Sequence, residues 1–100
     1  MIEIPLKSGS EYAHQRFTQR LGGNTLEFRI DYVAYQDEPM WTLCLYRDGA
    51  AVAEGMALVS GAILTENRNL PDDIGRLVFV GAEATLDNLG KDNKLVWQAT

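Results

Sequence analysis

Residues 21–32, LGGNTLEFRIDY, constrain the fold of this chain more than any other segment. After two glycines and an asparagine, apolar side chains recur at every second position, which is the spacing of a half-buried β-strand. Gly-Gly-Asn also supplies the positive φ angles that a tight hairpin turn needs. The competing interpretation is a helix between Ser10 and the glycines, but that stretch offers only three scattered apolar residues: Tyr12, Phe17 and Leu21. We therefore predict a β-hairpin across residues 14–31.

Further segments of the first half predict strands joined by tight turns. Residues 2–6 alternate apolar and polar side chains, and Pro5, which cannot donate to a neighbouring strand, favours an edge position. WTLCLYR at residues 41–47 alternates in the same way, and Asp48-Gly49 directly after it is a hairpin signal. Residues 50–60 are then predicted to form the return strand, with Gly55 as the place of a bulge.

The second half of the chain is less regular. Residues 60–76 form the longest irregular segment, and long loops on small β domains are usually functional or interfacial. LVFVG at residues 77–81 is continuously apolar and predicts a strand that is buried on both faces. Residues 85–90 are compatible with a single helical turn between Thr85 and Gly90. Residues 94–99 predict a last strand.

This pattern predicts one mainly β domain over residues 1–100, a small antiparallel barrel or sandwich of about seven short strands with at most one short helical turn. The net charge of −5 without any basic run argues against specific nucleic-acid binding, because that binding depends on clustered cations. The apolar runs are too short to cross a bilayer, so no membrane association is expected. The lone Cys44 cannot form an intrachain disulfide.

The residue types needed for catalysis or metal binding are scarce. His14 and Cys44 are the single histidine and the single cysteine, and both are more simply explained as structural or surface residues. The aspartates fall mainly in predicted turns, where their side chains commonly bond to the backbone. No phosphate-binding glycine motif occurs. The sequence therefore predicts a non-enzymatic protein without cofactors or bound metal.

Several segments, taken in order, carry a resemblance that covers residues 2–98. They are IPL at residues 4–6, FTQRLGGNTLEFRI, WTLCLYRDG, GMALVSGAIL, GRLVFV, TLDNLG and KLVW. In their order and spacing the chain resembles the small β-rich baseplate plug proteins of contractile-tailed phages, typified by a cyanophage baseplate plug. The resemblance implies a structural protein of the virion tail baseplate, encoded by a phage or a prophage and made in the host cytoplasm.

The resemblance also implies partners, which are the tube, hub and spike proteins at the centre of the tail, with several copies in the assembly allowed. We predict a protein interface formed by the irregular loop and the first strand, comprising Ile2, Ile4, Ile63, Leu64, Asn67, Arg68, Leu70 and Pro71. Two alternatives stay open. One is an assembly adapter or chaperone of the baseplate, and the other is a small ligand-binding barrel with a cavity among inward aromatic residues such as Trp41, Phe28 and Phe79.

Overall fold

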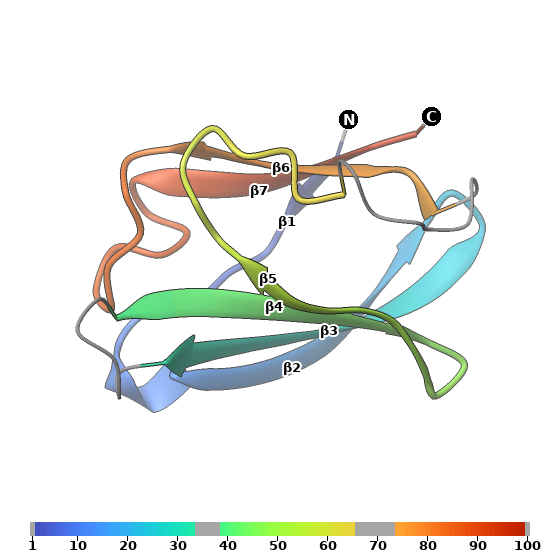
Figure 1. Ribbon diagram of the computed structural model, residues 1–100, viewed down its shortest axis with the longest axis horizontal. Coiled ribbons are helices and arrows are strands. Elements are labelled where there is room, and N and C mark those ends of the chain that lie inside the picture. Colours follow the sequence, from blue (N-terminus) through green and yellow to red (C-terminus); the bar gives the residue numbers. More distant parts are fainter. Residues whose placement is uncertain (1, 34–38, 66–73, 100) are drawn as a thin grey trace.

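The computed structural model describes residues 2–33, 39–65 and 74–99, and these form two antiparallel sheets that lie face to face (Figure 1). The small sheet has the order β1-β7-β6, and the large sheet has the order β2-β3-β4-β5. The strands are β1 (Ile2–Ile4), β2 (His14–Leu21), β3 (Asn24–Val33), β4 (Met40–Arg47), β5 (Ala50–Ala57), β6 (Arg76–Gly81) and β7 (Asn93–Gln98). The predicted mainly β fold is confirmed, and because the sheets are not closed into a barrel, it is a sandwich.

The only helix within the described ranges is a 3₁₀ turn, η1 (Ser10–Tyr12), which leads into β2. In this part of the chain, no helix is long and apolar enough to cross a membrane.

The large sheet consists of two hairpins placed side by side along the chain. β2 and β3 pair in unbroken register, and the two residues between them are glycines with φ angles of 57° and 88°. β4 and β5 are joined by Asp48 and Gly49, which also have positive φ angles, of 53° and 80°. Such angles give the turn the twist that fits the flanking strands. Both predicted hairpins are confirmed, and register shifts between β4 and β5 confirm the predicted bulge.

The small sheet joins the two ends of the chain. β7 lies in its centre, between β6 and the short edge strand β1, as Pro5 predicted for the first strand. On the other side of β6, Ile63 forms an isolated bridge with Val78, and the Leu64 amide donates to the carbonyl of Leu77 at 2.8 Å. Part of the predicted irregular segment therefore extends the small sheet.

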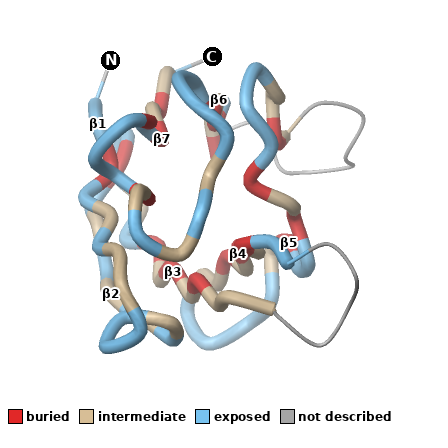
Figure 2. Tube along the Cα trace, turned by 90° about the vertical axis from the view of Figure 1, so that its left-hand side faces the viewer, coloured by how far each residue is buried: buried red, intermediate tan, exposed pale blue. Residues whose placement is uncertain are grey.

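The buried residues lie on strands of both sheets, as Figure 2 shows, and they form one hydrophobic core. Its largest fully buried side chains are Trp41, Phe28 and Phe79. Phe28 stacks on Phe17 with 5.2 Å between ring centroids, and Trp41 meets Tyr32 edge to face at 5.1 Å. Both ring contacts join neighbouring strands of the large sheet, where they combine apolar burial with favourable ring geometry.

Two predictions about the second half of the chain are wrong. The first concerns β6, which is buried on one face only. Leu77 and Phe79 point into the core, whereas Val78 is half-buried and Val80 is 39% exposed. The reason is architectural, because a two-layer sandwich covers only the inner face of each sheet.

The second error concerns residues 85–90, which form turns rather than a helical turn. The Asn88 side chain accepts a hydrogen bond from the amide of Thr85 at 2.6 Å and donates to the carbonyl of Glu83 at 2.8 Å. Bonds of this kind offer the backbone an alternative to helical bonding.

The turns of residues 82–92 are held to β7 by Asn93. It is 2% exposed and is the one buried polar residue in the part of the chain that the structure describes. Its Oδ1 accepts from the amide of Gly90 at 2.8 Å, and its Nδ2 donates to the carbonyl of Ala82 at 3.2 Å and to Oδ1 of Asn88 at 3.3 Å. One side chain thus connects three points of the loop.

Asn93→Ala is expected to lower the free energy of unfolding by about 2 kcal/mol, because it removes three part-buried hydrogen bonds that hold the loop. Urea unfolding followed by tryptophan fluorescence measures this change. Thr25→Ala, at an exposed position of β3, is the control and should change the stability by less than about 0.5 kcal/mol. If Asn93→Ala is as stable as the wild type, Asn93 does not hold the loop.

Candidate protein interface

The outer face of the small sheet carries a row of apolar side chains. Val96 on β7, Val78 on β6 and Ile63 on the bridged segment lie directly opposite one another. All three are half-buried, and Val80, two residues after Val78 on the same face, is exposed. We call these four residues the valine face. It follows from strand alternation, because the core residues Leu77 and Phe79 on β6 and Leu95 and Trp97 on β7 alternate with these valines.

Polar and charged side chains surround the valine face. Glu3 lies opposite Val96 on β1, and its Oε1 is 3.6 Å from Nζ of Lys94. Arg76 at the start of β6 is exposed, and it pairs in register with the half-buried Gln98. An apolar centre with a polar rim is the usual anatomy of a protein interface, in which the centre supplies burial and the rim supplies orientation.

The structure separates the residues that the sequence predicts for an interface. Ile63 lies on the valine face, and Ile2 is 37% exposed at the end of β1. Ile4 and Leu64 are 1% and 7% exposed and belong to the core. The remaining four lie outside the described residues: Asn67, Arg68, Leu70 and Pro71. The predicted contact surface therefore stays a prediction, while the side chains of Ile4 and Leu64 pack between the sheets.

Sequence reasoning missed the three valines of this face. Their strands read LVFV and KLVW, without the polar alternation that marks a half-exposed strand. Only the number of layers shows that one face is uncovered, and that number is not a local property of the sequence.

The histidine and the cysteine lie on different strands of the large sheet. On β2, Nδ1 of His14 is 2.8 Å from Oδ1 of Asp31, and both side chains are solvent-accessible. On β4, Sγ of Cys44 accepts from the amide of Gly55 at 3.4 Å. β3 lies between these two strands. The described residues contain no group of three or more His, Cys, Asp or Glu placed to hold a metal ion.

The aromatic residues proposed for a ligand cavity are fully buried and pack against the rest of the core. A hollow of about 680 Å³ lies at the start of β4, where Met40, Val59 and Trp41 contribute to its lining. Phe28 and Phe79 do not line it. The core is thus filled by its own side chains, as expected for a small β domain.

Within the described residues, the outer face of the small sheet is an apolar patch with a polar rim, which is typical of surfaces that contact other proteins. Comparison with protein families identifies the group more closely. The family described as the cyanophage baseplate Pam3 plug gp18 matches residues 1–100. The chain belongs to this family of phage baseplate plug proteins, which confirms the resemblance found in the sequence. No curated protein matches the chain.

Membership in this family indicates a structural role and a location in the tail baseplate of the virion, in association with other baseplate components.

Proposed function

We propose that this protein is a non-enzymatic part of a contractile phage tail, or of a prophage-derived particle, that contacts the central tube, hub or spike proteins. In this position it plugs or stabilises the channel at the tip of the tail. It is made in the host cytoplasm and incorporated during assembly. The observation that carries the proposal is the valine face, an apolar surface with a polar rim on a protein of a baseplate plug family.

The energetics of the valine face support a role as a contact surface. Completing the burial of a half-buried valine or isoleucine contributes roughly 1 kcal/mol, so the four residues together supply several kcal/mol. A standard interface buries about 800 Å² on each partner. The chain exposes 5959 Å², which leaves room for more than one such contact. Contact with several neighbours is what a plug between subunits requires.

The test compares purified tail particles that carry the wild-type protein with particles made with Val80→Asp/Val96→Asp, in which the two new carboxylates are not direct cross-strand partners. Quantitative mass spectrometry should find the wild type at a fixed, low stoichiometry with tube and hub proteins. The variant should stay folded, because both side chains lie on the outer face. Its copy number per particle should fall about tenfold or more, because the new charges oppose burial in a contact.

Ala50→Asp/Ala51→Asp adds the same charge at exposed positions of β5, at the far edge of the large sheet from β2, and serves as the matched control. It should be incorporated like the wild type. Absence of the wild type from intact particles while the lysate contains it would contradict the proposal and favour an assembly adapter or chaperone. Normal incorporation of the valine variant would show that another surface makes the contact.

A further inference from the structure

The outer edge of β2 is open to an additional strand. β2 pairs with β3 on one side, and none of the described strands lies next to it on the other. The amide of Tyr32 donates to the carbonyl of Ala13 at 2.7 Å, so this pair directly before the ladder is a bonded one. Bonded and non-bonded pairs alternate along an antiparallel ladder. Four residues therefore direct their backbone N–H and C=O groups to the open edge: His14, Arg16, Thr18 and Arg20.

None of these edge groups forms a hydrogen bond with any residue in the described ranges. The other edges are blunted in ways that prevent strand addition. β1 has three residues and is followed by Pro5, β5 is interrupted by its bulge, and the edge of β6 is occupied at Ile63. β2 is eight residues long and pairs without a register shift. Among the described strands it alone presents a long and regular edge.

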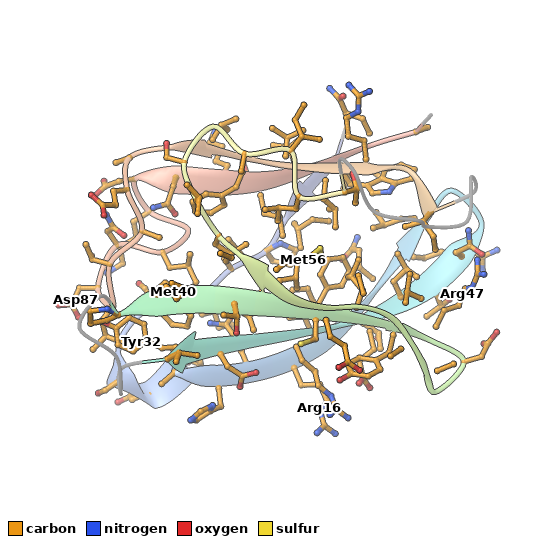
Figure 3. All side chains as sticks on the ribbon, viewed as in Figure 1. Arg16, Tyr32, Met40, Arg47, Met56 and Asp87 are labelled. Carbon is orange, nitrogen blue, oxygen red and sulfur yellow. The ribbon has the colours of Figure 1, made fainter. Side chains whose placement is uncertain are left out.

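The charge of β2 is opposite to that of the chain. The net charge of the protein is −5, yet β2 carries two arginines, one histidine and no carboxylate. Arg16 and Arg20 are exposed, and Arg16 points away from the body of the molecule (Figure 3). Neither forms an ion pair with a residue that the structure describes. Arg29, opposite Arg16, engages Glu27 at 3.0 Å, so that carboxylate is already occupied.

The inner side of β2 is incompletely covered. Gln15, Phe17 and Gln19 point toward the core side but are only half-buried. Beside the first half of the strand lies a hollow of about 420 Å³, and its lining includes Phe17, Tyr12 and Lys7. A fifth strand next to β2 would cover Phe17 from the side that Phe28 leaves open. Apolar side chains would be suited to this position.

We propose that the β2 edge accepts an extended, acidic segment of a neighbouring baseplate protein as a fifth antiparallel strand of the large sheet. The segment carries two carboxylates four residues apart, opposite Arg16 and Arg20 on the outer face. Apolar residues opposite Phe17 and Gln19 cover the inner face. The identity of the partner rests on the proposed baseplate function, whereas strand addition is a property of the edge itself. Main-chain bonds then give affinity, and the alternating side chains give specificity.

The test uses the isolated protein and a fluorescein-labelled peptide, TVEVTVEVT, which has this pattern. Fluorescence anisotropy should show saturable binding. The peptide with both glutamates replaced by lysine should bind with an affinity at least about tenfold lower, because two ion pairs are replaced by repulsion. Arg16→Glu/Arg20→Glu should reverse this preference, so that the variant binds the lysine peptide better.

Two further variants distinguish backbone pairing at the β2 edge from a general effect of the charge of the protein. Thr18→Pro removes an N–H that faces the open edge and leaves the bonds to β3 intact, so it should weaken binding about tenfold or more while the protein stays folded. Arg76→Glu/Lys94→Glu makes the same charge change on the small sheet and should leave the affinity within about twofold. Bound peptide should also slow amide hydrogen exchange at Arg16, Thr18 and Arg20 by about tenfold.

Absence of saturable binding at about 1 mM peptide, or unchanged exchange at these three amides, would overturn strand addition. Equal binding by Thr18→Pro would overturn it as well. These results are independent of the particle experiment. If the wild-type protein is incorporated into tails but does not bind the peptide, the proposed function stands and the β2 site is refuted. If the protein binds the peptide but is absent from particles, the strand-accepting edge is confirmed and the proposed baseplate partner is refuted.

Discussion

Gly75→Ala is expected to lower the free energy of unfolding by about 3 kcal/mol. An added Cβ would lie 2.5 Å from Nε1 of Trp97 and 2.7 Å from the carbonyl oxygen of Gln98, both closer than a carbon atom tolerates. The indole cannot move away freely, because its N–H donates to the carbonyl of Ile74 at 2.7 Å. The φ angle of 88° adds the strain of a left-handed conformation. Urea unfolding followed by the fluorescence of the two tryptophans measures the loss.

Gly49→Ala is the matched control for Gly75→Ala. Gly49 has a similar φ angle, 80°, but an added Cβ there would meet no atom within 4 Å. We expect a loss of about 1 kcal/mol, which isolates the backbone strain from the steric overlap. Equal losses at the two positions would mean that the contact between β7 and the start of β6 can relax around an extra methyl group.

Leu64→Asp is expected to leave the protein unfolded at neutral pH. Leu64 is 7% exposed, belongs to the core and is held next to β6 by the hydrogen bond from its amide to the carbonyl of Leu77. The substitution removes roughly 2 kcal/mol of apolar burial and places a carboxylate among apolar side chains, which costs several kcal/mol more. The sum is comparable with the whole stability of a small domain, about 5–15 kcal/mol. Circular dichroism and one-dimensional NMR report the loss of folded structure.

Ile63→Asp makes the same kind of change one residue earlier, on the opposite face of the segment. Ile63 lies on the valine face, where the carboxylate remains in contact with water, so we expect a loss of about 1 kcal/mol or less and a folded protein. If Leu64→Asp were as stable as Ile63→Asp, the Leu64 side chain would lie outside the core. It would then be available as the contact residue that the sequence predicts.

The strands and hairpins of the large sheet could be predicted from the sequence because their determinants are local. Gly22-Gly23 and Asp48-Gly49 fix both turns, and the residues after them alternate with a period of two. The distribution of strands between two sheets is different, since it depends on pairing between distant segments. β1 and β7, for example, pair across almost the whole length of the chain.

The candidate interface could be predicted only in part for the same reason. An apolar residue in a strand belongs either to the core or to a contact surface, and periodicity does not distinguish the two when both faces are apolar. Ile4 and Ile63 both looked suitable for contacts, but Ile4 faces the second layer and Ile63 faces away from it. The helical turn predicted near Thr85 does not form, because the Asn88 side chain bonds to the local backbone instead.

The central position of β7 in the small sheet determines when the protein can acquire its final form. The large sheet uses four strands that are consecutive in the chain, so its hairpins can assemble while the ribosome is still translating the rest. β1 and β6 are not paired with each other and have to wait for β7, the last of the seven strands to be made. Until then the apolar inner face of the large sheet has no cover. Apolar surface that is exposed in this way in a nascent chain favours aggregation until the second layer forms.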